Sequence, residues 1–171
     1  MPIVAIEGPN LSGKSTLVRE LMESYPKFAL VPGLPLREEL LPVMAAAEER
    51  SLALWEALYD PRRVYLCDRH PAVSEAVYSQ LNCRKSARIS PEWHNRIFLV
   101  YLRPSLAELN RRLLARGDAL ATPSRLAREL ELYDAVASNF SWRLIIDSAS
   151  PFTTLTRSST WQEVATRLRC S

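Results

Sequence analysis

The sequence predicts an α/β fold with three layers, in which helices cover both faces of a central parallel sheet of about five strands. The first observation is that short apolar runs alternate with helical periodicities along the whole chain. The second is that runs such as 97–102 (IFLVYL) are apolar throughout, as strands buried on both faces are. The third is a glycine-bracketed loop at 8–15, placed between the first apolar run and the first helical pattern. A length of 171 residues fits one domain spanning 1–171.

The predicted strands are short runs rich in β-branched and aromatic residues. In chain order they are 3–6, 28–31, 64–68, 97–102 and 142–146. The run at 64–68 (VYLCD) ends in Asp68, and the last run leads into Asp147. We therefore expect two of the strands to deliver a carboxylate at their C-terminal ends.

Segments with apolar residues at helical spacing predict the helices between these strands. In chain order they are 16–22, 37–59, 71–81, 106–116, 124–138 and 161–169. Pro42 interrupts the second helix, Pro71 suits the first turn of the third, and Ser105 is a candidate cap of the fourth. No helix is predicted in the Ser/Thr-rich stretch 148–160.

Residues 8–15 (GPNLSGKS) match the phosphate-binding loop pattern G-x-x-x-x-G-K-[ST] at every fixed position. Glycines allow backbone N–H groups to curl around phosphate oxygens, and the following helix N-terminus favours negative charge. We expect an exposed Lys14 to bridge the outer phosphates of ATP, and Ser15 with Asp68 to hold Mg²⁺. The loop residues expected to contact the nucleotide are Gly8, Pro9, Asn10, Leu11, Ser12, Gly13, Lys14, Ser15 and Thr16.

The composition indicates which partners and which cellular compartment to expect. No apolar run approaches the roughly 18 residues needed to cross a bilayer, so no membrane partner is expected. Three cysteines without metal-ligand spacing, and a first strand that starts at once, favour a cytoplasmic protein with free thiols. The net charge of +3 permits contact with nucleic acid without requiring it.

Several motifs resemble those of thymidylate kinases and their relatives. They are IEGPNLSGKSTL at 6–17, DRH at 68–70 followed by Ser74 and Tyr78, VYLRP at 100–104, and Arg112 with RGD at 116–118. The resemblance implies that Asp68 works near Mg²⁺ and that Arg69 holds the phosphate of the acceptor. It also implies an arginine-bearing lid around 111–124, with Arg112 and Arg116 closing over ATP, and a segment after Asp147 that covers the adenine. A homodimer is a further expectation of this kind.

The acceptor side departs from that family. Thymidylate kinases usually have an aspartate at the place of Asn10, and an R-E-P segment where this chain has VPGLPL at 31–36. Deoxynucleoside kinases place a catalytic glutamate in a similar run, where Gly33 stands here. The chain is also short for a thymidylate kinase. These departures indicate a divergent member, of viral origin in one reading, in which case the compartment is the host cytoplasm.

The predicted function is ATP-dependent transfer of a phosphoryl group to a nucleotide-type acceptor, with a deoxynucleoside monophosphate as the first choice. The residues expected to act are Lys14, Asp68, Arg69, Arg112 and Arg116. A phosphate acceptor needs no general base, whereas a hydroxyl acceptor would benefit from one, for which Asp68, Glu38 and Glu39 are candidates.

Two other functions stay open at this point. One is a kinase that phosphorylates a hydroxyl of a hydroxymethylated pyrimidine within DNA, favoured by the altered acceptor loop, by 19 arginines among 22 basic residues and by the basic loop 82–90. The other is a nucleotide-binding regulatory ATPase. It ranks last because the Asp68-Arg69 pair implies a phosphate acceptor and the N-K-x-D base-reading motif is absent.

Overall fold

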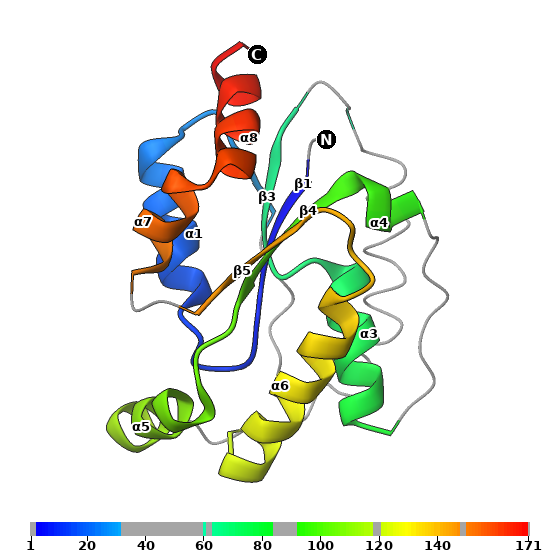
Figure 1. Ribbon diagram of the computed structural model, residues 1–171, viewed down its shortest axis with the longest axis vertical. Helices are drawn as coiled ribbons and strands as arrows, with labels where there is room; N and C mark the ends of the chain where they lie inside the picture. The colour runs from blue at the N-terminus through cyan, green and yellow to red at the C-terminus, as the bar shows by residue number, and fades with distance from the viewer. Residues whose placement is uncertain are drawn as a thin grey trace.

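Five parallel strands form one central sheet, which confirms the predicted fold class (Figure 1). The computed structural model describes residues 3–31, 60, 63–83, 92–117, 121–147 and 150–170. The strands are β1 (Ile3–Glu7), β2 (Ala29–Val31), β3 (Tyr65–Asp68), β4 (Ile97–Leu102) and β5 (Arg143–Ile146). They lie in the order β2-β3-β1-β4-β5, and every pair of neighbours is parallel. Each strand lies within one or two residues of its predicted position.

The helices of the described residues mostly follow the predicted pattern. They are α1 (Lys14–Ser24), α3 (Pro71–Leu81), α4 (Glu92–Arg96), α5 (Leu106–Arg116), α6 (Pro123–Ala137), α7 (Pro151–Arg157) and α8 (Ser159–Cys170). Helix α7 occupies part of the Ser/Thr-rich stretch in which no helix was predicted. It forms because Leu155 is fully buried against the sheet and Pro151 stands at its first turn. The helix predicted at 37–59 lies outside the described residues.

The two faces of the sheet are covered by different helices (Figure 1). Alternate side chains of β1, β3 and β4, such as Ile3 and Leu99, pack with α3 and α6 on one face. The intervening side chains, such as Val4 and Val100, pack with α1, α7 and α8 on the other. This division follows from the period of two along a strand, because successive side chains point to opposite faces.

Helix α5 lies beyond the carboxyl end of the sheet, where the phosphate-binding loop also lies, and the N-terminal part of α6 lies next to it (Figure 1). Leu109 of α5 and Leu126 and Leu130 of α6 make a separate buried cluster, and Leu11 of the loop packs against it. The helix pair is therefore attached to the loop by apolar contact as well as by the polar contacts described below. None of the helices in the described part of the chain is long and apolar enough to cross a membrane.

Candidate active site

The phosphate-binding loop joins the end of β1 to the start of α1, as its motif predicts. Gly8 has φ of 146°, and a Cβ atom there would lie 2.4 Å from the carbonyl oxygen of Leu102 on β4. Gly13 has φ of 98° and precedes the first helical residue, Lys14. Glycine is required at the first position by the approach of the neighbouring strand, and at the second mainly by the backbone angle.

Lys14 is buried in the structure, which corrects the expectation that its side chain is exposed. Its ammonium donates to the carbonyl oxygens of Gly8 (2.9 Å) and Pro9 (2.7 Å) and to the hydroxyl of Ser12 (3.2 Å). The side chain folds back because the loop carbonyls offer acceptors close by. Burial lowers the pKa of Lys14, the positive charge of Arg69 lowers it further, and the Glu7 carboxylate opposes both effects.

Ser15 and Asp68 meet across the junction of α1 and β3. The Ser15 hydroxyl donates to Oδ2 of Asp68 at 2.8 Å, and Ser15 is exposed while Asp68 is half-buried. The register explains the contact, since Asp68 is paired with Ile6 of β1, two residues before the loop begins. The structure thus brings together the two residues predicted to hold Mg²⁺.

Arg69 follows immediately and points to a different part of the site. Its backbone is in the left-handed region with φ of 69°, an unusual conformation for a residue with a side chain. One terminal nitrogen, Nη1, donates to the hydroxyl of Tyr133 (2.7 Å), and Nη2 donates to Oδ1 of Asn10 (2.9 Å). The guanidinium also lies over the ring of Tyr78, with its central carbon 5.2 Å from the ring centroid.

Glu7, the last residue of β1, contacts the residues that surround Arg69. It is fully buried, and its carboxylate accepts from the backbone N–H of His70 and from the hydroxyl of Tyr133. Burial raises the pKa of Glu7, and the charge of Arg69 opposes that rise. Glu7 therefore holds the residue that follows Arg69 and the tyrosine that Arg69 contacts.

Glu129 of α6 is a site residue that the sequence reasoning missed. It is fully buried, and its carboxylate accepts from the backbone N–H of Asn10 (2.7 Å) and from the Asn10 side-chain amide (3.3 Å). Arg125, one turn earlier on the same helix, lies 3.6 Å from it. One signal was present in the sequence, because Glu129 interrupts an apolar stripe formed by Leu126, Leu130 and Tyr133.

The two arginines predicted to form a lid differ in position. Arg112 donates to the backbone carbonyl of Leu11 (2.9 Å) and to Glu108 (2.7 Å), so it reaches the phosphate-binding loop. Arg116 ends α5 and is exposed, with no ion pair to any residue in the described ranges. Arg111 pairs with Glu108 on the outer surface. Arg112 thus faces the loop as predicted, and a role for Arg116 at the loop stays a prediction.

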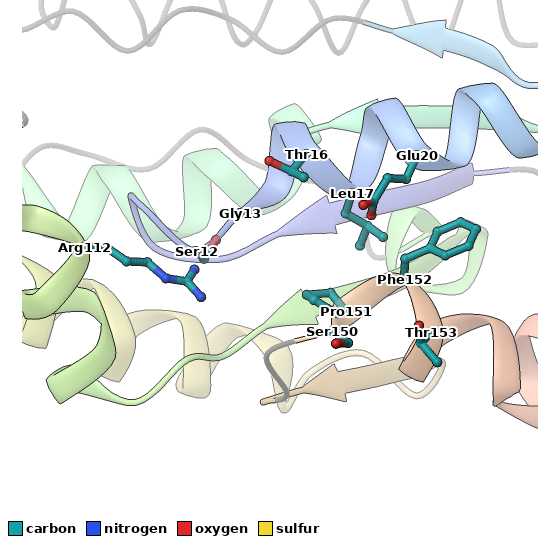
Figure 2. Close-up of a pocket in the computed structure, with 10 residues that line it drawn as sticks. All are labelled: Ser12, Gly13, Thr16, Leu17, Glu20, Arg112, Ser150, Pro151, Phe152 and Thr153. Carbon is teal, nitrogen blue, oxygen red and sulfur yellow. The ribbon is translucent and has the colours of Figure 1, made fainter. Parts of the chain in front are cut away.

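A pocket of about 420 Å³ opens between the loop, α1 and the start of α7 (Figure 2). Ser12, Gly13, Thr16, Leu17 and Glu20 line one wall, and residues 150–153 line the opposite one. Figure 2 shows the Arg112 guanidinium pointing into the pocket from one end, with Phe152 at the other. The segment shortly after Asp147 therefore contributes to this pocket, while Asp147 itself is exposed.

Comparisons with solved structures agree with the fold of the chain. The YorR protein from Bacillus subtilis, in complex with phosphorylated GDP, superposes with a TM-score of 0.67 at 20% identity, covering 98% of this chain and 95% of that one. A deoxyadenosine kinase from M. mycoides, with dCMP and dCDP bound, gives 0.60 at 16% identity, covering 99% and 100%. A gluconokinase from Sinorhizobium meliloti 1021 gives 0.51 at 19% identity, covering 98% and 91%. The chain has the fold of P-loop kinases.

Within the P-loop kinase fold, a narrower assignment to thymidylate kinases stays a prediction. No family model matches the chain. No curated protein matches its sequence either. Glu38, Glu39, Gly33 and the basic residues 84–88 lie outside the described residues.

Proposed function

We propose that this chain is an ATP-dependent phosphotransferase whose acceptor is a deoxynucleoside monophosphate. The observation that carries the proposal is the divergence of two consecutive side chains at the end of β3. Asp68 contacts Ser15 beside the phosphate-binding loop, and Arg69 turns toward Asn10 and Tyr133. One strand end would thus supply an acid for the metal on the donor side and a cation for a phosphate on the acceptor side.

On the donor side, Lys14 and Arg112 both use loop carbonyls as acceptors. Lys14 donates to Gly8 and Pro9, and Arg112 donates to Leu11. Both cations would exchange these bonds for phosphate oxygens, to which a charge-assisted bond is stronger. Arg112 also enters the pocket beside the loop, so the nucleoside of ATP would occupy that pocket. The cations would then offset charge that accumulates on the phosphates during transfer.

Ser15 and Asp68 are the residues that would hold Mg²⁺. Hydroxyl and carboxylate oxygens are ligands of the kind that Mg²⁺ prefers, and kinase sites bind it with one or two protein oxygens together with phosphates and water. This fits the described residues, among which no group of three or more His, Cys, Asp and Glu gathers as a metal cage. When bound, the ion would supply charge neutralisation at the transferring phosphate.

On the acceptor side, Arg69 would hold the phosphate of the monophosphate. Within the described chain its terminal nitrogens donate one hydrogen bond each, which leaves other N–H groups of the guanidinium for a ligand. The likeness to deoxyadenosine kinases supports a second acceptor class, the hydroxyl of a deoxynucleoside. In that case Asp68 is the described carboxylate best placed to accept the proton.

The test is a transfer assay with γ-labelled ATP, Mg²⁺ and three sets of acceptors: the four deoxynucleoside monophosphates, the four deoxynucleosides, and DNA with and without hydroxymethylated pyrimidines. We expect label on at least one monophosphate, its loss with a chelator, and its return with added Mg²⁺. Label on deoxynucleosides alone would replace the acceptor by the second class. Release of phosphate with no labelled acceptor would refute a transferase and leave an ATPase.

A further inference from the structure

A chain of hydrogen bonds with a fixed direction links helix α6 to Arg69 through the phosphate-binding loop. Arg69 donates from Nη2 to Oδ1 of Asn10 at 2.9 Å. Asn10 in turn donates from Nδ2 to Oε1 of Glu129 at 3.3 Å, and from its backbone N–H to Oε2 at 2.7 Å. Asn10 therefore acts as an acceptor on one side and as a donor on the other.

The direction of these hydrogen bonds determines which residue types fit at positions 10 and 129. A side chain between a guanidinium and a carboxylate must accept from the first and donate to the second, and an amide does both. An aspartate at position 10 would still accept from Arg69, but it would place its second oxygen against the carboxylate of Glu129. A glutamine at position 129 would turn an N–H toward the N–H of Asn10. Positions 10 and 129 are thus chemically dependent on each other, although they lie 119 residues apart.

Helix α6 holds the guanidinium of Arg69 at a second point. Tyr133 lies one turn after Glu129 and accepts directly from Nη1 of Arg69 at 2.7 Å. Both residues are buried, with exposed fractions of 0% for Glu129 and 1% for Tyr133. The two terminal nitrogens of Arg69 are therefore both fixed by one helix face, Nη1 directly and Nη2 through Asn10.

We infer that Asn10 and Glu129 form a positioning pair that fixes Arg69 in the orientation that binds the phosphate of the acceptor. The inference rests on the proposed function, and it goes further by assigning acceptor affinity to a contact between the loop and α6. The carboxylate comes from α6, and the loop residue is the amide that connects it to Arg69.

The test is an exchange of the two residue types. Four variants are compared with the unaltered chain: Asn10→Asp, Glu129→Gln, the double variant that carries both changes, and Glu131→Gln as a matched control. Glu131 lies on the same helix, is exposed, and pairs with Arg128 away from the site. For each protein, kcat, the KM of the best monophosphate and the KM of ATP are measured at a temperature where unfolding curves show it to be folded.

Each single change should raise the KM of the acceptor about tenfold or more, because a buried polar group loses its partner. In Glu129→Gln the KM of ATP should change by less than about threefold, because Glu129 lies on α6 and outside the phosphate-binding loop. In the double variant, glutamine donates to aspartate and aspartate still accepts from Arg69, so the side-chain bond between positions 10 and 129 is restored with its donor and acceptor exchanged. Its acceptor KM should return to within about threefold of the unaltered chain, and Glu131→Gln should match the unaltered chain. Where a single variant does not fold, recovery of both folding and acceptor KM in the double variant is the expected result.

The contrary outcomes are distinct from one another. Three outcomes would overturn the positioning role while leaving a kinase: single variants with unchanged acceptor KM, a double variant as impaired as the worse single one, or an equal rise of the acceptor KM and the ATP KM in Glu129→Gln. An unaltered chain that phosphorylates no monophosphate would remove the proposed acceptor, and this inference with it.

Discussion

Tyr133→Phe tests how much the hydrogen bonds around Arg69 contribute to stability and to acceptor binding. The Tyr133 hydroxyl accepts from Arg69 at 2.7 Å and donates to Oε2 of Glu7 at 3.1 Å. Phenylalanine removes that hydroxyl alone, because the ring can keep its stacking on Tyr101, whose centroid lies 5.7 Å away. Two buried groups therefore lose a partner while the packing is retained.

The loss of stability in Tyr133→Phe follows from the bonds that the Arg69 guanidinium and the Glu7 carboxylate lose. A buried donor or acceptor left without a partner costs about 1–3 kcal/mol. Because Arg69 keeps its bond to Asn10 and Glu7 keeps its bond from His70, we expect about 1–2 kcal/mol for each group and a fall in the free energy of unfolding of about 2–4 kcal/mol. For a chain of this size, 1 kcal/mol corresponds to about 2–4 °C in Tm, which gives a fall of about 4–16 °C. Arg69 also loses one of its two fixed points, so the KM of the acceptor should rise while that of ATP stays nearly constant.

Tyr101→Phe is the matched control, since it makes the same chemical change in the neighbouring ring. The Tyr101 hydroxyl donates to Asp134, and that carboxylate also accepts two bonds from Arg103 at the surface. Its loss should cost about 1 kcal/mol or less. Thermal unfolding followed by circular dichroism gives both values. Equal shifts in Tm for the two variants, or an unchanged acceptor KM in Tyr133→Phe, would refute the reasoning.

Three further predictions concern the loop and its surroundings. Lys14→Ala should lower kcat by about 100-fold or more in the transfer assay, because a donor preorganised for the phosphates is lost; an active variant would exclude Lys14 from the mechanism. Gly8→Ala should lower the free energy of unfolding by about 3 kcal/mol or more, because the new Cβ would lie 2.4 Å from a backbone oxygen. In Gly13→Ala the nearest atom is 3.7 Å from the new Cβ, so backbone strain of about 1–2 kcal/mol is the main cost. Burial lowers the pKa of His70 to about 3 in the folded protein. Between about pH 6.5 and pH 3, therefore, the unfolded protein binds a proton at this residue and the folded protein does not. As the pH falls through this range, the free energy of unfolding should decrease by up to about 1.4 kcal/mol per pH unit. His70→Asn, which can still accept from the N–H of Ala72, should weaken that acid sensitivity in unfolding curves; an unchanged dependence on pH would count against it.

Local chemistry explains why most elements could be placed from the sequence. The run at 97–102 is apolar at every position, and it forms a strand that is buried at every position. Ser105 accepts from the backbone N–H of Glu108, as a cap at the start of α5 should. Helix α7 was missed because its threonines have low helix propensity, and its stability comes from packing of Leu155, which a local reading does not contain.

In the candidate site too, some features could be predicted from local sequence and others depend on tertiary packing. The loop and the Ser15–Asp68 contact follow from a motif and from strands that end at one edge of a parallel sheet. The burial of Lys14 could not be predicted in that way, because it depends on where the loop carbonyls point. The contact of Glu129 with Asn10 depends on the placement of α6, which no pattern near the loop specifies.

Glu129 nonetheless shows how such a contact can be sought in a sequence. A carboxylate within an apolar helical stripe is costly to bury unless a partner is provided, so its presence predicts a polar group facing that helix. In this chain the polar group is the amide of Asn10, in the phosphate-binding loop. Two departures, one in the helix and one in the loop, have a common explanation when each supplies what the other lacks. The amide at position 10 needs a carboxylate, and the carboxylate at position 129 needs donors, so each residue gives the physical reason for the other.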